Sequence, residues 1–247
     1  MNRLDQALVD RGLCPSRERA KRAIMAGQVT INGRIAAKPS DIVKPQDRVG
    51  LTEPERFVSR GGHKLEHALN HFQLDVTGWT AVDLGASTGG FTDCLLQRGA
   101  AKIYAVDVGH GQFAWKLRRD HRVVVMEKTN ARTLTLTAMP NGFAPAYLTV
   151  IDCSFISLRK ILPAAIALTR PSGRILALVK PQFEAGKDEA DKGEGVITDP
   201  AIHTRVLAEL QNFVAQFSQV KWLGTIESPL LGPAGNKEFF ALIEKVA

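Results

Sequence analysis

The stretch Ala81-Val82-Asp83-Leu84-Gly85-Ala86-Ser87-Thr88-Gly89-Gly90-Phe91 decides the fold, because it passes from an apolar strand through a glycine turn into a helix. Glycines in such a turn let the backbone approach a ligand, and the helix N-terminus offers unpaired N–H groups. The dinucleotide fingerprint G-x-G-x-x-G does not fit the spacing of Gly85, Gly89 and Gly90. Asp83 would also repel a pyrophosphate. A ligand that lacks phosphate and carries an ammonium group suits this loop better.

The pattern D-x-G-x-S-x-G-G-F resembles motif I of S-adenosylmethionine-dependent methyltransferases. The resemblance implies S-adenosyl-L-methionine as cofactor, with contacts from Asp83, Gly85, Ser87 and Gly89. Asp107 ends the next predicted strand about 20 residues on, where an acid commonly takes ribose hydroxyls. Asn130 follows the strand after that and is placed to contact the adenine. The simpler alternatives are a plain strand-to-helix joint for the loop, and helix caps or surface polar residues for Asp107 and Asn130.

Apolar runs alternate with helical patterns after residue 58, which is typical of a mostly parallel sheet covered by helices. The predicted strands are Thr80–Leu84, Lys102–Val106, Val123–Met126, Tyr147–Ile151, Gly173–Val179, Lys221–Ile226 and Glu238–Ile243. The last two enclose no long helix, so we expect them to form an antiparallel hairpin at the sheet edge. We therefore expect an α/β fold with a seven-stranded Rossmann-like sheet, the plan of class I methyltransferases.

The N-terminal segment predicts a small α+β module. Ser16 is a plausible N-cap for a basic helix that ends near Gly27. Asn32-Gly33, after Val29-Thr30-Ile31, is a strong two-residue hairpin signal. This order resembles the S4 RNA-binding domain over residues 1–50. The resemblance implies that the basic helix faces RNA phosphates with Arg17, Arg19, Lys21 and Arg22.

Charge is concentrated in the same segment. The chain of 247 residues has a formal charge of +7, and residues 1–48 hold ten Lys/Arg against five Asp/Glu. Basic domains attract polyanions, although a solubilising face without a ligand explains the charge alone equally well. The polar, proline-punctuated stretch 51–58 is predicted to be a linker, which leaves residues 59–247 for the catalytic domain.

Several classes of protein do not fit the sequence. The longest apolar run, Ile161–Leu168, is too short to span a bilayer, and no signal peptide follows Met1. Three cysteines without Cys-x-x-Cys spacing indicate reduced thiols in a cytoplasmic protein, with no disulfide frame and no metal site. The sequence does not predict an oligomeric state.

Four charged residues from distant segments fall where strands or helices begin or end: Lys64, Asp152, Lys180 and Glu238. The carboxyl ends of strands in an open α/β sheet are where ligands bind, so these side chains can converge. A lysine serves as a base when burial and a second lysine lower its pKa, whereas carboxylates orient it. We therefore expect Lys180 to be the general base with Asp152 as its partner, and Lys64 and Glu238 to tune the site. Any one of these residues taken alone is better explained by a surface salt bridge, and only the four together favour a site.

Lys-Asp-Lys-Glu is the tetrad of the FtsJ-like ribose 2′-O-methyltransferases, and with the S4-like segment the whole chain resembles the TlyA family. The segments that carry this resemblance are Ser59–Leu65, Asp152–Leu158, Val179–Glu184 and Gly235–Phe239. The resemblance implies 2′-O-methylation of a cytidine in ribosomal RNA. Arg56-Phe57-Val58 departs from the family, which often has tryptophan before the valine. The short chain resembles members that act on large-subunit rRNA.

Two other functions stay open from sequence: a non-catalytic RNA-binding factor in ribosome assembly, and a membrane-active haemolysin, the family's common label. Phe155, Phe183 and Phe239 flank the catalytic segments, either as core residues or as rings that stack on a base. We expect the charged, glycine-rich segment 184–198 to be a mobile loop that helps residues 1–50 to select the ribose.

Overall fold

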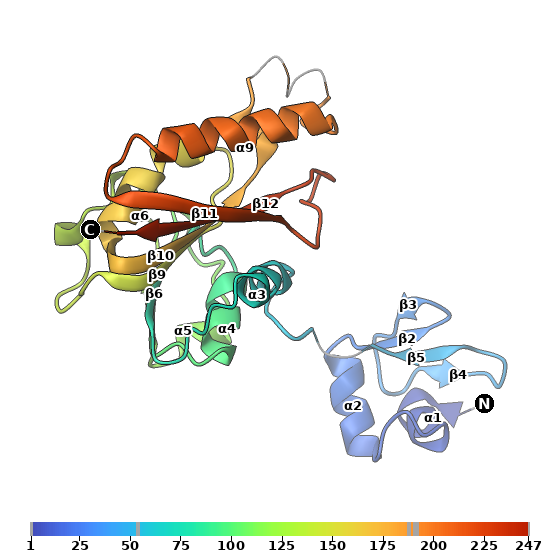
Figure 1. The fold of residues 1–247 in the computed structure, drawn as a ribbon. Coiled ribbons are helices and arrows are strands. Elements are labelled where there is room, and N and C mark those ends of the chain that lie inside the picture. The colour runs from blue at the N-terminus through green and yellow to red at the C-terminus, as the bar shows by residue number, and fades with distance from the viewer. Residues whose placement is uncertain (1, 53–54, 187–188, 190–192, 247) are drawn as a thin grey trace. The chain divides into compact units, whose positions relative to one another are not determined.

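The computed structural model describes residues 2–52, 55–186, 189 and 193–246, and the chain divides into two compact units, 1–56 and 57–247. Figure 1 shows the course of the chain through both units. Each unit has a hydrophobic core of its own. The core of the first is built around Leu4, Leu8, Ile24 and Val29.

The first unit is the small α+β module that the sequence predicts. Its elements are β1 (Asn2–Arg3), α1 (Leu4–Asp10), α2 (Arg17–Met25), β2 (Val29–Ile31), β3 (Arg34–Ile35), β4 (Ile42–Val43) and β5 (Val49–Leu51). The Ser16 hydroxyl accepts a hydrogen bond from Arg19 N at 3.3 Å and caps α2 as expected. Asn32 and Gly33 both have positive φ, 51° and 82°, which gives the tight turn between β2 and β3.

The second unit carries a seven-stranded sheet in the order β11-β12-β10-β9-β6-β7-β8. Its strands are β6 (Thr80–Leu84), β7 (Lys102–Val106), β8 (Val123–Met126), β9 (Ala146–Ile151), β10 (Thr169–Val179), β11 (Val220–Glu227) and β12 (Phe239–Lys245). Strands β8, β7, β6, β9 and β10 are parallel, and β12 pairs with both β10 and β11 in the antiparallel sense. The terminal hairpin at the sheet edge is therefore confirmed.

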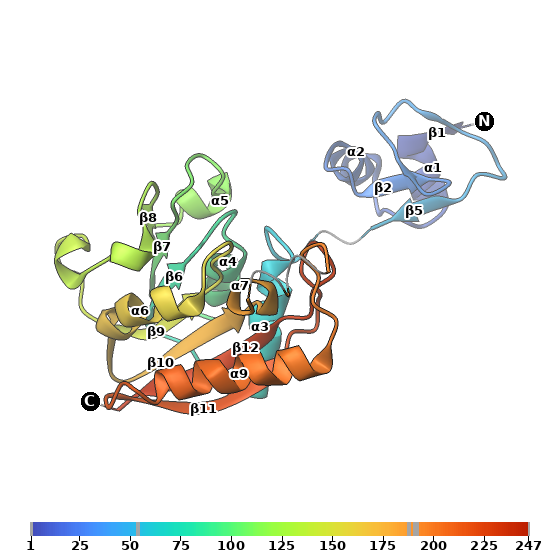
Figure 2. The ribbon, with the colours of Figure 1, turned by 90° about the horizontal axis from the view of Figure 1, so that it is seen from above.

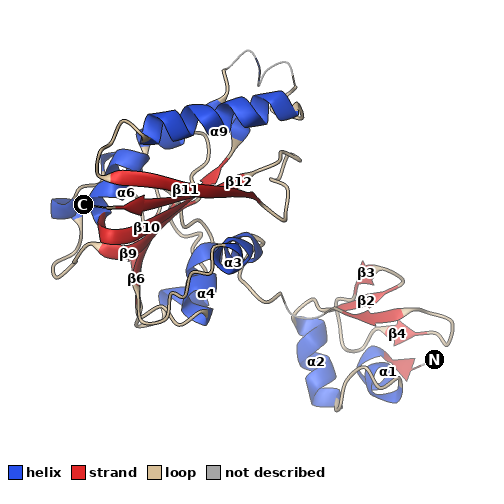
Figure 3. Ribbon diagram, in the orientation of Figure 1, coloured by secondary structure: helices blue, strands red, loops and turns tan. Residues whose placement is uncertain are grey.

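Helices cover both faces of this sheet (Figures 1 and 3). One face carries α3 (Gly61–His71), α4 (Gly90–Gln97) and α5 (Trp115–Arg118), whose apolar side chains join the core cluster that includes Leu65, Leu95 and Leu117. The other face carries α6 (Leu162–Leu168) and α9 (Pro200–Val214) through Ile166 and Leu210, as the turned view in Figure 2 also shows. The remaining short elements are α7 (Pro181–Glu184), η1 (Ala131–Thr133), η2 (Leu136–Ala138) and η3 (Leu158–Lys160).

The predicted strands β6, β7 and β8 have the observed bounds, and the others differ at their ends. Strand β10 begins at Thr169 because its first residues pair irregularly with β9 before the regular register starts at Arg174. Two findings concern the segment predicted as a linker. Leu51, the first residue of the predicted linker, belongs to strand β5, which pairs with β2. Phe57, near the end of the predicted linker, is buried in the core of the second unit.

Candidate active site

Adjacent strands bring the predicted catalytic segments together at the carboxyl edge of the sheet. Strands β10, β9 and β6 are neighbours, and Ile151 at the end of β9 lies beside Leu84 at the end of β6. The chain leaves these strands at Lys180, Asp152 and Gly85, so the three residues lie at one edge. No property of the local sequence fixes this neighbourhood, since it depends on strand order.

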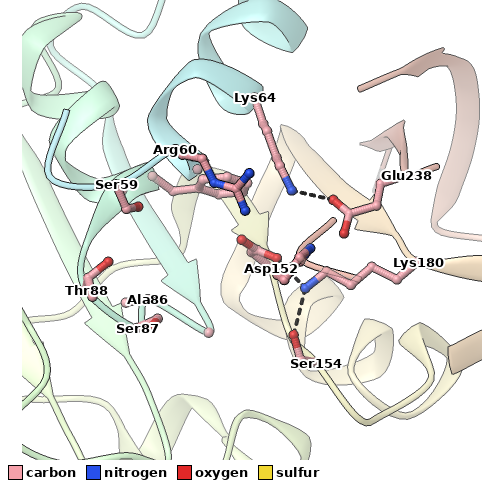
Figure 4. A pocket seen from close by; sticks show the side chains of 15 residues that line it. Ser59, Arg60, Lys64, Ala86, Ser87, Thr88, Asp152, Ser154, Lys180 and Glu238 are labelled. Carbon is pink, nitrogen blue, oxygen red and sulfur yellow. Dashed lines mark hydrogen bonds and ion pairs between the residues drawn. The ribbon is translucent and has the colours of Figure 1, made fainter. Parts of the chain in front are cut away.

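The four charged residues form two ion pairs, and their side chains point toward one another in Figure 4. Lys64 Nζ, from the first turn of α3, lies 2.6 Å from Glu238 Oε2, just before β12. Lys180 Nζ lies 2.6 Å from Asp152 Oδ1 and donates a hydrogen bond of 2.8 Å to Ser154 Oγ. The Asp152 contact is an ion pair without the alignment of a hydrogen bond.

Burial distinguishes these pairs from ordinary surface salt bridges. Lys64 and Lys180 are only 7% and 8% exposed, and Glu238 is 1% exposed. Removing one partner from the Lys64–Glu238 pair leaves an uncompensated buried charge, whereas the Asp152 side chain, 26% exposed, keeps some contact with solvent. Gly232 also packs closely here, since a Cβ at this position would lie 2.5 Å from Glu238 Oε1. The segment before β12 therefore shapes the space around the Glu238 carboxylate.

A cavity of about 280 Å³ opens beside the two pairs. Three cationic side chains line it (Arg60, Lys64 and Lys180), with two carboxylates (Asp152 and Glu238). The cavity also reaches the turn after β6, at Ser87 and Thr88, and the start of α3. We call it the catalytic cavity. It combines a slight excess of positive charge with hydroxyl groups, which suits a polar, anionic ligand.

A second cavity of about 420 Å³ adjoins the first, and we call it the nucleoside cavity. The two share Gly85, Ser87, Asp152 and Ser154, and Lys180 of the first cavity contacts both Asp152 and Ser154. Asp107 and Asn130 supply polar groups to the nucleoside cavity. Its apolar lining includes Val106, Val108, Ala131, Phe155, Ile156 and Ile161. Apolar walls with a few polar groups fit an adenine ring and a ribose, so the residues present suit the adenosine part of S-adenosyl-L-methionine.

Asp107 organises the rim of the nucleoside cavity. Its Oδ2 accepts a hydrogen bond from Ser87 N at 2.8 Å, and its Oδ1 accepts one from Gly109 N at 2.6 Å. Asn130 Oδ1 accepts from Arg132 N and caps η1, so Asn130 both caps a helix and lines the cavity. The simple capping role and the binding role considered from sequence are therefore compatible for Asn130.

Two of the residues predicted to contact the cofactor, Asp83 and Gly89, do not line either cavity. Among the residues described, the lining of the two cavities includes Gly85 and Ser87 but neither Asp83 nor Gly89. Asp83 is fully buried, and its Oδ2 accepts a hydrogen bond from Thr92 Oγ1 at 2.7 Å. Gly89 precedes α4 with φ 98°, and a Cβ there would meet the Leu117 side chain at 2.4 Å. Asp83 therefore contacts α4, and Gly89 lies against α5.

Burial has a clear effect on Asp83. Desolvation raises the pKa of its carboxyl to about 7, against the hydrogen bond from Thr92, and the nearby carboxylates Asp152 and Asp107 raise it further. Burial likewise raises the pKa of the Cys153 thiol to about 12, with Asp152 adding to the effect. Cys153 is therefore a neutral packing residue beside the site and is not a nucleophile.

Phe155 is the main feature of the site that sequence reasoning did not assign. Its side chain is 91% exposed although it lines the nucleoside cavity, and its backbone has φ 61°. Its ring contacts Phe183 with a centroid distance of 5.2 Å. Phe239, the third aromatic residue considered, instead packs partly buried against the core. The sequence shows only that an aromatic residue, Phe155, lies three residues after Asp152. It does not show that this residue is exposed.

The basic helix of the first unit keeps its cations on the surface. Arg17, Arg19, Lys21 and Arg22 are all exposed. Arg17 nevertheless has an internal role, because its guanidinium lies 2.9 Å from the buried carboxylate of Asp5. Arg22 pairs with Glu18 on the next turn at 2.5 Å.

The segment 184–198, expected to be mobile, lies partly outside the described residues, which omit 187–188 and 190–192. Its described parts have several attachments. Glu189 pairs with Arg205 of α9. Asn236 Nδ2 donates to Gly195 O, and Asn236 Oδ1 accepts from Ile197 N, both at 2.8 Å. Asn236 thereby ties this segment to the turn that carries Glu238.

Two features of other classes of protein are absent from the described residues. None of the helices there is long and apolar enough to cross a membrane. No group of three or more histidine, cysteine, aspartate or glutamate side chains gathers in the described ranges as metal ligands would.

Family models, related sequences and solved structures all match this chain. The FtsJ-like methyltransferase family model matches residues 57–245, and the S4 domain model matches residues 2–49. The 16S/23S rRNA (cytidine-2′-O)-methyltransferase TlyA of Mycobacterium tuberculosis is 48% identical, over 96% of this chain and 88% of that protein. Hemolysin A of Brachyspira hyodysenteriae is 38% identical, over 97% and 98%. A solved structure described as a hemolysin from Streptococcus thermophilus superposes with a TM-score of 0.74 and 43% identity, covering 99% of this chain and 88% of that one.

Proposed function

The chain belongs to the FtsJ-like methyltransferase family, and we propose that it transfers a methyl group from S-adenosyl-L-methionine to a ribose 2′-hydroxyl of ribosomal RNA. The observation that carries the proposal is the position of Lys180. Its Nζ lies beside Asp152 and Ser154, which line both cavities. A lysine at this junction can reach an acceptor oxygen in one cavity while a methyl donor is held in the other.

The nucleoside cavity would hold the adenosine part of the cofactor between Asp107 and Asn130. The Ser87 and Thr88 segment, with the start of α3, would hold the rest in the catalytic cavity. When bound, the cofactor supplies an electrophilic methyl group on a sulfonium. The protein's part is to bring the hydroxyl oxygen into line with that methyl group and to remove its proton.

Lys180 is the proposed general base. To act, Lys180 must first release to solvent the proton that it carries in the ion pair with Asp152. The proton of the 2′-hydroxyl would then pass to Nζ as the oxygen bonds to the methyl carbon and the bond from that carbon to sulfur breaks. The Asp152 carboxylate, 2.6 Å away, stabilises the ammonium group that results. The Ser154 hydroxyl, 2.8 Å away, fixes the direction of Nζ. Proton removal by a positioned base contributes about 10²–10⁴-fold to such reactions.

Lys64 and Glu238 are proposed to position the acceptor. Their direct ion pair leaves other Lys64 donors and Glu238 lone pairs facing the catalytic cavity that they line. A ribose offers hydroxyls that both donate and accept, so a lysine–carboxylate pair can orient it. Arg60 in the same cavity is suited to a neighbouring phosphate.

Ribosomal RNA as the substrate class is supported by two independent features. The first unit matches the S4 domain model and presents exposed cations on α2. The relative from Mycobacterium tuberculosis is named for cytidine 2′-O-methylation of 16S and 23S rRNA. We propose a cytidine in large-subunit rRNA as the acceptor, since cytidine and 23S rRNA both stand in the name of that relative. A cytoplasmic location follows from this substrate.

A transfer assay tests the proposal. The purified chain is incubated with tritiated S-adenosyl-L-methionine and ribosomal subunits from cells that lack it, and the RNA is then examined for ribose methylation. We expect methylated cytidine with the wild type and a loss of at least about 10²-fold with Lys180→Met. The control Lys221→Met changes an exposed lysine of β11 and should leave the rate unchanged. Wild-type protein that binds cofactor but methylates neither subunit, even as free RNA, would contradict the proposal.

A further inference from the structure

Glu184 is a buried carboxylate close to Lys180 that the proposed chemistry does not use. It is 7% exposed and ends α7, the short helix that begins directly after Lys180 and is labelled beside β10 in Figure 2. We propose that Glu184 is a positioning residue that holds the Asp152 segment against the Lys180 segment. The inference rests on the proposed function for the consequence in catalysis, but the positioning itself is independent of it.

Both oxygens of Glu184 bind the segment that follows Asp152. Ser157 Oγ donates a hydrogen bond to Oε2, and Leu158 N donates one to Oε1, each at 2.6 Å. These distances are at the short end for hydrogen bonds to a carboxylate, which are stronger than neutral ones. A side chain with both oxygens committed to one segment acts as a cross-link between the two loops.

The cross-link is one of three along the same two segments. Nearest the chemistry, Lys180 contacts Asp152 and Ser154. Next, the Phe183 ring contacts the Phe155 ring. Last, Glu184 binds Ser157 and Leu158. Successive residues after β10 therefore meet successive residues after β9, and Glu184 closes the far end.

The backbone between the two polar cross-links is strained. Phe155 has φ 61°, a left-handed conformation that a bulky residue rarely adopts. Such a conformation persists only when the surrounding structure holds it, and it is common at functional sites. Lys180 holds Ser154 on one side of Phe155, and Glu184 holds Ser157 on the other. Loss of the Glu184 contacts would free the segment to relax and would move both Asp152 and the exposed ring.

The hydrogen bonds, and not the charge, are the feature that positions the segment. Burial raises the pKa of Glu184, while the bonds from Ser157 and Leu158 and the charge of Arg159 lower it. A glutamine has nearly the same shape. Its oxygen can accept from Leu158 N, and its amide can donate to the Ser157 hydroxyl, which also accepts. Glu184→Gln should therefore restore what Glu184→Ala removes.

A rate measurement tests the catalytic consequence in the full chain with tritiated cofactor and ribosomal subunits. Glu184→Ala is expected to lower kcat about 10²-fold, because small misplacements of reacting groups have effects of this size. Its dissociation constant for S-adenosyl-L-methionine should change less, by about threefold, because Asp107 and Asn130 are untouched. Glu184→Gln should recover to within about tenfold of the wild type. The control Glu244→Ala removes a carboxylate that pairs with Arg174 at 2.7 Å and should leave kcat unchanged.

Hydrogen exchange tests the positioning without any activity. The Leu158 amide should be protected in the wild type and in Lys180→Met, and should exchange at least about tenfold faster in Glu184→Ala. Peptides from β6 and β12 report whether the unit stays folded. Should Glu184→Ala unfold the unit, Ser157→Ala is the milder variant: it removes the Ser157–Glu184 bond and the bond from Arg159 N to Ser157 Oγ, but leaves Leu158 N bound to Glu184. It should show a smaller increase confined to residues 152–160.

Three results would overturn the proposal: unchanged exchange at Leu158 in Glu184→Ala, wild-type kcat in that variant, or a folded Glu184→Gln that is as inactive as Glu184→Ala. The last would show that the charge of Glu184 matters and not its hydrogen bonds. Absence of methylation by the wild type, with the exchange pattern as predicted, would instead remove the proposed function and leave the positioning intact.

Discussion

Two ion pairs in this molecule have nearly the same length and opposite surroundings. Arg22 and Glu18 on α2 of the first unit lie 2.5 Å apart, with side chains 72% and 76% exposed. Lys64 and Glu238 in the second unit lie 2.6 Å apart, with side chains 8% and 1% exposed. Each charge of the first pair stays hydrated whether or not the other is present. Each charge of the second pair is removed from water and is compensated by the opposite charge beside it. Distance alone does not reveal which charges the fold requires.

The same contrast separates the two units by function. The cations of α2 lie on a surface that a polyanion can cover, where position matters less than total charge. The charges at the carboxyl edge of the sheet are held in fixed pairs beside a cavity. We infer that the first unit contributes affinity and the second contributes chemistry.

The strongest test of this contrast removes one lysine from the buried pair. Lys64→Met leaves the Glu238 carboxylate buried and uncompensated, so it should lower the free energy of unfolding of the second unit by about 3–5 kcal/mol. Adding Glu238→Gln should recover a large part of that loss. Arg22→Met in the exposed pair should cost under about 0.5 kcal/mol. Urea unfolding followed by tryptophan fluorescence measures the second unit, because Trp79, Trp115 and Trp222 all lie there. A cost for Lys64→Met as small as that for Arg22→Met would erase the distinction.

The buried carboxyls of Asp5 in the first unit and Asp83 in the second should give the two units opposite dependences of stability on pH. Burial raises the pKa of Asp5, but hydrogen bonds from Arg3 and Arg17 outweigh it and hold the pKa below 3.8. Asp5 therefore stabilises the first unit above pH 4, and this contribution is lost as the pH falls through the lowered pKa. Asp83 is the opposite case, because its pKa is raised to about 7 and its contribution is lost as the pH rises from 4 through 7.

The two units should thus respond to pH in opposite directions. Labelling of the buried Cys14 thiol follows opening of the first unit, and tryptophan fluorescence follows the second. Asp83→Asn should flatten the dependence of the second unit between pH 4 and 7, while Asp5→Asn should flatten that of the first below pH 4. If neither substitution changes its own profile, the assigned surroundings of these carboxyls are wrong.

The smallest expected effect concerns the exposed cations. Arg19→Gln and Lys21→Gln remove charges that lie on the surface of α2, and together they should weaken binding to ribosomal RNA by about tenfold at low salt. The difference should shrink as salt rises, and kcat should not change. Filter binding across a salt series measures both. A loss of kcat with unchanged affinity would assign these residues to chemistry.

Much of the fold could be predicted from sequence because its signals are local. The apolar runs of β6, β7 and β8 and the Asn32-Gly33 turn each contain their own information, and the structure confirms them. The short strands β1, β4 and β5 could not be found in this way. Each has two or three residues and exists through its pairing with a distant segment.

The site likewise has features that the local sequence predicts and features that depend on distant segments. The residue types and element ends identified Lys64, Asp152, Lys180 and Glu238, and family resemblance paired them with a reaction, but their roles remain predictions. The cofactor contacts predicted for Asp83 and Gly89 also remain predictions, although neither residue lines the two cavities. The cross-link from Glu184 to Ser157 could not be inferred, since it joins segments whose proximity follows from strand order.

The central claim is that the Lys180–Asp152 centre methylates a ribose of ribosomal RNA. The most direct measurement is ribose-methylation mapping of both ribosomal RNAs from cells that lack the chain, complemented with the wild type, Lys180→Met or the control Lys221→Met. We expect a 2′-O-methylated cytidine that is present with the wild type and the control and absent with Lys180→Met at equal protein levels. Full methylation with Lys180→Met, or identical maps with and without the chain, would contradict it.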